Sequence, residues 1–213
     1  MFKNLKMKTS LTSAITVLTI ICITILYIST QTGMTKLMKK SAQDSMKTSL
    51  NSQTTLISEY VSHQEDLLKK FSISPIIIDY LKDLNNKDKQ LKAQQFTENY
   101  FKGLDNWEGI YSGEWNTHVV THSNPKVVGM TTRKGDSLKA LQNAMKENNG
   151  LYNAGIIVSP ASQKLILSMY CPVYDTDGST IVGYVGGGPY MEKLERLLNE
   201  TKKTTKNLYN IRC

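Results

Sequence analysis

Hydrophobic and polar positions follow a strand-like pattern in the last third of the chain. Segments 151–159, 164–174 and 180–188 are rich in β-branched and aromatic residues, and short polar connections at 160–162 and 175–178 separate them. This pattern predicts three strands in succession, and connections this short favour an antiparallel arrangement.

The middle of these strands predicts a sheet with two different faces, because side chains alternate across a strand. One face would carry Leu165, Leu167, Met169, Cys171 and Val173, and the other Lys164, Ile166, Ser168, Tyr170, Pro172 and Tyr174. We expect a helix or a second sheet to cover the apolar face, and the mixed face to line a pocket for a small polar molecule. The alternative for Tyr170 and Tyr174 is that each buries its ring and bonds a backbone carbonyl.

A hairpin and a helix precede these strands. Strands are predicted at 109–113 and 118–122, on either side of a turn at 114–117. A helix should follow from Asp136, which can cap its first turn, to 149–150, where Asn-Gly supplies a left-handed stop. Its apolar stripe is Leu138, Leu141 and Met145. The predicted fold class is therefore α+β, with a PAS-like five-stranded antiparallel sheet.

The N-terminal region contains a long apolar run. No charged residue occurs between Lys8 and Lys36, and 11–28 is mainly Ile, Leu, Val and Thr. A helix of about 20 mostly apolar residues spans a bilayer, so we expect a transmembrane helix at 11–30. The alternative is a cleavable signal peptide, but the run is long for a signal core and 29–32 lacks a small-residue cleavage pattern.

The orientation of this helix follows from size more than from charge. Lysines lie on both sides of the run in similar numbers, so the positive-inside rule nearly ties. We expect the short tail at 1–10 to stay in the cytoplasm and the large C-terminal domain to be translocated. The predicted location is a bacterial cell membrane, with one membrane pass and an extracytoplasmic domain.

Helices are predicted on both sides of the sheet segments. Residues 34–72 lack proline and glycine and show one apolar stripe, which predicts a stalk helix of about 60 Å at 1.5 Å per residue. We expect its polar first part, 36–52, to be free or to pair with a second subunit as a homodimer, and its far part to cover the apolar sheet face. Shorter helices are expected at 76–84, where Ser74 would cap and Pro75 would begin the helix, at 88–101 with Leu91, Phe96 and Tyr100 inward, and at 191–198. Residues 202–207 read as a solvated run and 208–213 as the start of a strand.

Charge and cysteine content exclude some classes of protein. The chain has 213 residues and a formal net charge of +8, but its lysines are scattered and no nucleic-acid motif occurs, so no nucleic-acid partner is expected. Three cysteines are too few for a disulfide framework. Cys171 is expected to be a small buried hydrophobe, although a bridge between Cys171 and Cys213 stays open.

No motif predicts an enzyme, a metal site or a cofactor. His118 and His122, four apart on a strand, would lie about 13 Å from each other, too far to share a zinc ion. The glycines at 186–188 lack dinucleotide-loop spacing, so we interpret them as a close backbone approach to another element or to a ligand. The acidic turn at 175–178 begins like a calcium loop but lacks the later ligands. Paired catalytic carboxylates and a nucleophile motif are also absent from the sequence.

The segments WNTHVVTHSNPKVVGMTTRKGDSLKALQNAM, GLYNAGIIVSPASQ and SMYCPVYDTDGSTIVGYVGGG, placed after an anchor and a long helix, resemble the Cache sensor domains of bacterial membrane receptors. The similarity is to the membrane-distal module of double-Cache ectodomains of methyl-accepting chemotaxis proteins and diguanylate cyclases, and spans roughly 34–190. It implies a sensor domain at 73–190. Because such receptors continue into a second module, a second span and an output domain, it also implies that 191–213 holds a helix and the truncated start of that module.

The resemblance implies a small-molecule ligand such as an amino acid, a carboxylate or an amine. By position, Arg133 matches a loop that often supplies a carboxylate-holding arginine, and Tyr152 and Tyr170 fall on pocket-facing positions. The candidate ligand-binding residues are Tyr111, Trp115, His122, Arg133, Tyr152, Ser168 and Tyr170. For Arg133 the alternative is a plain surface charge, and for His122 a structural loop anchor. The aromatics after the arginine and the aspartate on the last strand, both typical of amino-acid binders, are missing here.

The predicted function is a membrane-anchored extracytoplasmic sensing domain of a chemotaxis-type signal-transduction receptor. Ligand binding would shift the helix packing between dimerised subunits. The alternative is an anchored adaptor or accessory protein whose sheet binds a partner protein and no small molecule.

Overall fold

The computed structural model describes residues 2–147 and 150–210 and divides them between two compact units, Met1–Ser52 and Gln53–Cys213. The helices are α1 (Phe2–Ser72), α2 (Pro75–Lys82), α3 (Lys87–Lys102), the 3-10 turn η1 (Pro125–Val127), α4 (Gly135–Glu147) and α5 (Glu192–Asn210). The strands are β1 (Trp107–Gly113), β2 (Val119–His122), β3 (Tyr152–Val158), β4 (Leu165–Tyr174) and β5 (Ile181–Pro189). The α+β class predicted from the sequence is confirmed.

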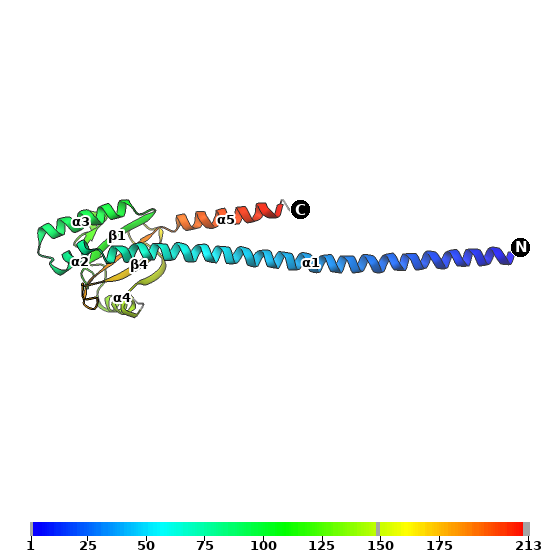
Figure 1. Ribbon diagram of the computed structural model, residues 1–213, viewed down its shortest axis with the longest axis horizontal. Coiled ribbons are helices and arrows are strands. Elements are labelled where there is room, and N and C mark those ends of the chain that lie inside the picture. Colours follow the sequence, from blue (N-terminus) through cyan, green and yellow to red (C-terminus); the bar gives the residue numbers. More distant parts are fainter. Residues whose placement is uncertain (1, 148–149, 211–213) are drawn as a thin grey trace. The chain divides into compact units, whose positions relative to one another are not determined.

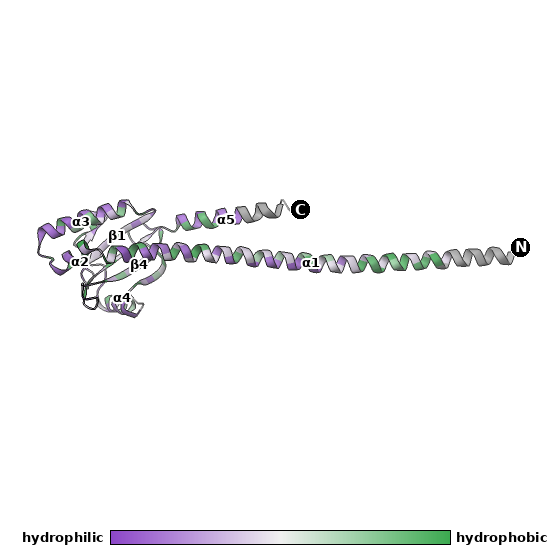
Figure 2. Ribbon diagram, viewed as in Figure 1, coloured by the Kyte–Doolittle hydropathy of each residue, from purple (hydrophilic) through white to green (hydrophobic). Residues whose placement is uncertain are grey.

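The first unit contains the N-terminal part of α1. Its hydrophobic side chains between Ile15 and Ile28 are exposed, and Figure 2 shows them as a continuous hydrophobic stretch. By length and composition this part of α1 can cross a membrane. Further along the helix, Leu37, Met46 and Leu50 are exposed as well. Most side chains of the polar segment expected at 36–52 are exposed.

The second unit is built around a five-stranded antiparallel sheet of order β2-β1-β5-β4-β3. The predicted hairpin and the predicted succession of three strands are both confirmed. Figure 1 shows α3 and α4 on opposite sides of this sheet. The sheet therefore has one face toward α1, α2 and α3 and another toward α4.

The face toward α1, α2 and α3 forms the main core. Leu167, Met169, Cys171 and Val173 of β4 are buried there together with side chains of the three helices, which include Leu68 and Phe71 of α1 and Ile77 of α2. This is the apolar face expected from the alternation in β4. Leu165 is not part of this core and is 45% exposed. Cys171 is a free, buried thiol whose pKa burial raises, and Cys213 lies outside the described residues.

Ser74 is the N-cap residue of α2 and its carbonyl accepts from the Ile78 N–H at 3.0 Å, but its hydroxyl accepts no cap hydrogen bond; Pro75 begins the helix as predicted. Two other local predictions were wrong. On α3, Leu91 points outward and is 58% exposed, because the inner stripe is Ala93, Phe96, Thr97 and Tyr100 at spacings of three and four. Of the strand start predicted at 208–213, residues 208–210 instead continue α5, since no proline or glycine interrupts the helix, and 211–213 lie outside the described residues.

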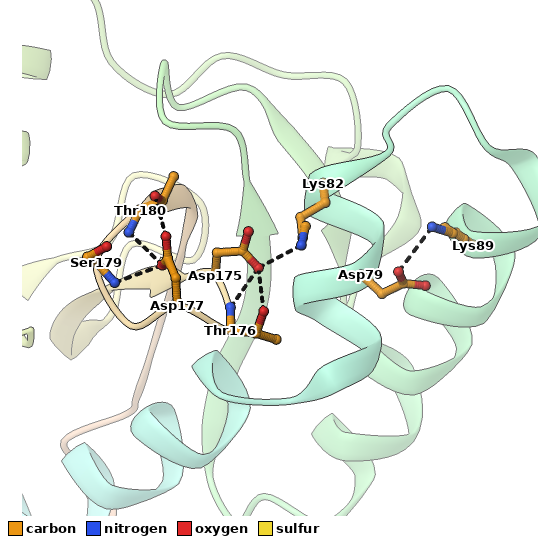
Figure 3. A network of polar contacts seen from close by, with 8 residues as sticks. All are labelled: Asp79, Lys82, Lys89, Asp175, Thr176, Asp177, Ser179 and Thr180. Carbon is orange, nitrogen blue, oxygen red and sulfur yellow. Dashed lines mark hydrogen bonds and ion pairs between the residues drawn. The ribbon is translucent and has the colours of Figure 1, made fainter.

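The turn between β4 and β5 is fixed by its own side chains (Figure 3). The carboxylate of Asp177 accepts hydrogen bonds from the backbone N–H groups of Ser179 and Thr180, at 2.8 and 2.9 Å, and from the Thr180 hydroxyl at 2.7 Å. Asp175 pairs with Lys82 of α2 at 2.7 Å. The turn that resembled a calcium loop is thus a hairpin turn tied to α2.

Candidate ligand-binding site

The sheet face toward α4 carries a row of three tyrosines and one glycine across four strands. Tyr111 of β1 lies opposite Gly186 of β5, Gly186 opposite Tyr170 of β4, and Tyr170 opposite Tyr152 of β3. Alternation along each strand puts these positions on one face. Glycine in the middle of the row leaves room for the neighbouring ring, because a Cβ there would lie 2.5 Å from the Tyr111 hydroxyl oxygen.

Tyr184 and Arg133 complete what we call the tyrosine–arginine cluster: Tyr111, Arg133, Tyr170 and Tyr184. Tyr184 is fully buried and meets Tyr111 edge-on, with ring centroids 5.9 Å apart. Arg133 Nη2 donates to the Tyr170 hydroxyl at 3.1 Å, and the guanidinium carbon lies 5.5 Å from the Tyr170 ring centroid. A guanidinium and three phenols therefore meet at one place on the sheet.

The backbone of Arg133 is held by Thr117 in the turn between β1 and β2. The Thr117 hydroxyl accepts from the Arg133 N–H and donates to the Arg133 carbonyl, each at 3.0 Å. Thr117 is fully buried, and its carbonyl accepts from Thr132 N–H at 3.1 Å. The loop that carries the arginine is thereby fixed to the sheet, so the guanidinium has a defined position.

Charge in the cluster is positive. Burial would lower the pKa of Arg133, but the hydrogen bond to Tyr170 and the nearby phenols outweigh it, and the pKa lies above its usual value. Burial raises the pKa of Tyr184 to about 12 and that of Tyr111 well above its usual range. The phenols of Tyr111 and Tyr184 therefore stay protonated at neutral pH. No carboxylate pairs with Arg133 within residues 2–147 and 150–210.

His122 stacks on Tyr111, with ring centroids 5.4 Å apart and planes 9° from parallel. Burial lowers the pKa of His122 to about 4, so its ring is neutral at physiological pH. Its Nδ1 accepts from the Asn124 N–H at 2.8 Å, which places the ring proton on Nε2. His122 thus presents a neutral ring with one donor.

The remaining predicted residues surround the cluster. The Ser168 hydroxyl donates to the Tyr170 hydroxyl at 3.1 Å, and the rings of Tyr152 and Tyr170 are stacked with centroids 6.2 Å apart. Trp115 packs at the edge, where its carbonyl accepts from Gln142 of α4 at 2.9 Å. Leu141 and Met145 of α4 cover the cluster from above the sheet. The structure brings all seven predicted residues to this face.

Sequence reasoning missed Tyr184, Thr117 and Thr132. Tyr184 could have been found from the sequence, because it stands two residues before Gly186 on the same strand and therefore lies on the same face of the sheet. Thr132 lies 3.5 Å from the Tyr184 hydroxyl through a loop whose path the sequence does not show. Nothing in the sequence pointed to Thr117, because its hydrogen bonds to Arg133 depend on how the loop before α4 packs against the turn between β1 and β2.

A groove of about 400 Å³ lies elsewhere, between α3, β2 and η1. It is lined by Lys87, Gln90, Leu91, Gln94, Val120, Pro125 and Val128. None of these residues belongs to the tyrosine–arginine cluster. Gln94 nevertheless hydrogen-bonds the backbone of His122 on β2, and the His122 ring stacks on Tyr111 of the cluster, so β2 lies between the groove and the cluster.

The fold is that of the Cache-type extracellular sensor domains, as the resemblance in sequence predicted. The Vibrio cholerae histidine kinase DctB sensor domain matches with a TM-score of 0.59 at 11% identity, over 74% of this chain and 59% of that one. The Campylobacter jejuni chemoreceptor Tlp3 ligand-binding domain, in complex with 4-methylisoleucine, matches with a TM-score of 0.53 at 16% identity, over 70% and 58%. The extracellular domain of the histidine kinase vpHK1S-Z8 matches with a TM-score of 0.57 at 15% identity, over 74% and 63%.

This chain spans about three fifths of the length of each of these structures. By sequence it matches no family model and no curated protein. At identities this low, the likeness concerns the fold.

Proposed function

We propose that this chain is a membrane-anchored sensor domain that binds a small metabolite bearing a carboxylate. The ligand would lie on the sheet face toward α4, at the tyrosine–arginine cluster. The residues proposed to contact it are Tyr111, Trp115, His122, Arg133, Tyr152, Ser168 and Tyr170. Tyr184 joins them because it shares the face and contacts Tyr111.

The observation that carries this proposal is the unbalanced charge of Arg133. Its guanidinium is partly buried against Tyr170 and has no carboxylate partner within the described residues. Burying a charge without an opposite charge costs free energy, and a bidentate carboxylate is the partner that best fits a guanidinium. A bound carboxylate would supply the missing charge, and the protonated phenols would donate to its remaining lone pairs.

The structural neighbours support this class of ligand. One of them, the Tlp3 domain, is described in complex with the amino-acid analogue 4-methylisoleucine, which contains a carboxylate. Within the described residues no carboxylate is hydrogen-bonded or ion-paired to Tyr111, Arg133, Tyr170 or Tyr184, which favours carboxylates that lack an α-amino group. Glu108, whose buried Oε1 has no hydrogen-bond partner there, acts electrostatically on His122 beside the cluster, so the amino acids in the screen test this preference.

The anchor and the subunit contacts belong to the same proposal. The exposed apolar stretch of α1 supports insertion in a membrane, with the second unit outside the cytoplasm. The exposed side chains Met46 and Leu50 support pairing of α1 with α1 of a second copy. Ligand binding would bias the packing of this dimer and pass a signal to a chemotaxis-type or kinase-type output.

The experiment is a thermal-shift screen of the full chain in detergent, against matched sets of carboxylates, amino acids and amines. A ligand that binds only the native state raises its stability by RT ln(1 + [L]/Kd), about 2.7 kcal/mol at a hundredfold excess over Kd. We expect carboxylates to raise the Tm and amines of the same carbon skeleton to leave it unchanged. If no member of the panel shifts the Tm, the adaptor alternative replaces the sensor.

A further inference from the structure

Helix α3 is hydrogen-bonded to the outer strand β2 by Gln94. The Gln94 amide Nε2 donates to the His122 carbonyl at 2.8 Å, and its Oε1 accepts from the His122 N–H at 3.1 Å. The second proton on Nε2 is donated to Glu98 at 2.7 Å. Because a carboxylate accepts only from the nitrogen, Glu98 fixes which way the amide faces. The Gln94 side chain thus pairs with His122 as a neighbouring strand would.

A second polar connection runs from α3 into the sheet. The Thr97 hydroxyl donates to the Thr121 hydroxyl at 2.9 Å, and Thr121 and Ser112 hydroxyls lie 2.7 Å apart. All three residues are fully buried. Buried hydrogen bonds of this kind are costly to break, so α3, β2 and β1 keep one relative position.

Another side of α3 contacts the end of α1. Phe96 stacks on Phe71 of α1 with centroids 5.8 Å apart, and Tyr100 meets Phe71 at 5.1 Å. The Tyr100 hydroxyl donates to the Leu67 carbonyl at 2.7 Å. These contacts bury aromatic surface and satisfy a carbonyl, so α3 is attached to α1 as well as to β2.

We propose that Gln94 is a positioning residue for the ligand-binding face, and that α3 couples occupation of that face to the end of α1. Gln94 holds the backbone of His122, whose ring lies against Tyr111 of the cluster. A ligand that moves Tyr111 would change its stacking on His122, whose backbone is hydrogen-bonded to α3. The inference rests on the proposed function for its ligand, but the placement of His122 is testable without one.

The main test compares Gln94→Met with Gln90→Met in the full chain in detergent. Methionine keeps the length of glutamine and removes both hydrogen bonds to His122. Gln90 lies one helical turn earlier, lines the same groove and makes no hydrogen bond to His122. Calorimetric titration uses the carboxylate that gives the largest thermal shift. We expect Gln94→Met to weaken binding at least fivefold and Gln90→Met to change it less than twofold.

NMR titration of the His122 ring gives a readout that general destabilisation does not move. In the parent chain the ring should stay neutral down to about pH 4. In Gln94→Met, a released ring gains solvent, so its midpoint should rise toward the ordinary value near 6.5. An unchanged midpoint together with unchanged affinity overturns the positioning role.

The coupling to α1 is tested with Tyr100→Phe, which removes the hydroxyl that contacts the Leu67 carbonyl. If α3 couples the ligand-binding face to the end of α1, Tyr100→Phe should alter carboxylate affinity at least twofold in the parent chain. It should have no effect on affinity in the Gln94→Met background. Equal effects in both backgrounds, or none in the parent, overturn the coupling.

The outcomes separate this inference from the proposed function. If the parent chain binds no carboxylate, the proposed function fails, and the His122 midpoint alone decides whether Gln94 positions that ring. If Gln90→Met and Gln94→Met weaken binding equally, the ligand lies in the groove beside α3, and the positioning role is overturned.

Discussion

Arg133 carries the positive charge of the cluster, and its replacement is the first prediction at the scale of single residues. Arg133→Gln removes the charge but keeps a polar side chain, so carboxylate binding should weaken roughly 10- to 100-fold, because hydrogen bonds to charged groups contribute about 1.5 to 3 kcal/mol. Titration calorimetry measures the change. Lys134→Gln is the matched control, since it removes the same charge from the exposed neighbouring residue and should leave affinity unchanged.

A weakened Arg133→Gln with a normal Lys134→Gln would assign the carboxylate to the cluster. Equal losses in the two variants would mean that the ligand responds to overall charge only, and the site assignment would be wrong.

Gly186 is the residue whose lack of a side chain makes the cluster possible. A Cβ at this position would lie 2.5 Å from the Tyr111 hydroxyl and 2.6 Å from its Cζ, so Gly186→Ala must displace the Tyr111 ring. We expect a loss of about 1–3 kcal/mol in the free energy of unfolding, as is usual for overpacking. Urea denaturation measures this loss, and it should be accompanied by loss of carboxylate binding.

Gly103→Ala is the control for this change. Its added Cβ would come no closer than 3.4 Å, to the Tyr100 carbonyl, and its φ of −84° suits any residue. A Gly186→Ala variant as stable as Gly103→Ala would mean that Tyr111 has room to move, and that the glycine is not required for the placement of the ring.

Residues whose neighbours lie on regular strands could be placed from the sequence. Ser168 and Tyr170 were assigned to one face by alternation and Tyr152 by resemblance, and Ser168 donates to Tyr170, which lies opposite Tyr152 in the sheet. Arg133 was assigned by resemblance, and its contact with Tyr170 spans 37 residues of chain. Thr117 could not be found, because its contact depends on the path of the loop from η1 to α4. Alternation specifies which face of the sheet a strand residue occupies, whereas the contacts of a loop residue depend on the whole fold.

At the scale of elements, the β4–β5 turn provides a prediction about pH. Hydrogen bonds from the Thr180 hydroxyl and from the N–H groups of Thr180 and Ser179 lower the pKa of Asp177 well below its ordinary value near 3.9. A carboxyl with a lowered folded-state pKa contributes stability above its unfolded pKa and loses it as pH falls toward the folded value. The contribution of Asp177 is therefore complete above about pH 5 and decreases below pH 4.

The measurement is the Tm of the parent chain and of Asp177→Asn between pH 2 and pH 7. The variant should be less stable at neutral pH, and the difference should shrink below pH 4, since the parent loses its ionised acceptor there. Asp66→Asn, at an exposed position of α1, is the control and should follow the parent at every pH. A constant difference between parent and Asp177→Asn would show that the charge of Asp177 does not stabilise the turn.

Whole elements were easier to predict than their inward faces. All five strands and the helices near 76–84, 88–101 and 136–149 occur where composition and stop signals placed them. Leu91 was assigned to the wrong face of α3, because the small residues Ala93 and Thr97 face the sheet and a pattern that counts large hydrophobic residues misses them. The strand start expected at 208–213 was wrong over 208–210, because short β-favouring stretches also extend a helix that no proline or glycine stops.

In the whole molecule, the exposed apolar stretch of α1 determines where the chain can reside. Side chains such as Ile21, Ile23 and Ile25 are exposed to between 49% and 65%. In water, an uncovered stretch of this size would aggregate, and the hydrocarbon core of a bilayer is the environment it fits. The domain fold itself does not depend on this stretch, because the core of the second unit begins at Tyr60 of α1.

We therefore expect the full chain expressed in a bacterium to fractionate with the membrane and to resist carbonate extraction. Ile21→Lys combined with Ile25→Lys should move most of it to the soluble fraction or to inclusion bodies, because each lysine near the middle of a span costs about 2.5 to 3.5 kcal/mol of insertion. Ala42→Lys, outside the apolar stretch, is the control and should stay with the membrane. Protease added to spheroplasts should digest the second unit if it lies outside the cytoplasm. Protection of that unit in intact spheroplasts, with digestion after lysis, would place it in the cytoplasm, and a sensor of external carboxylates would then be excluded.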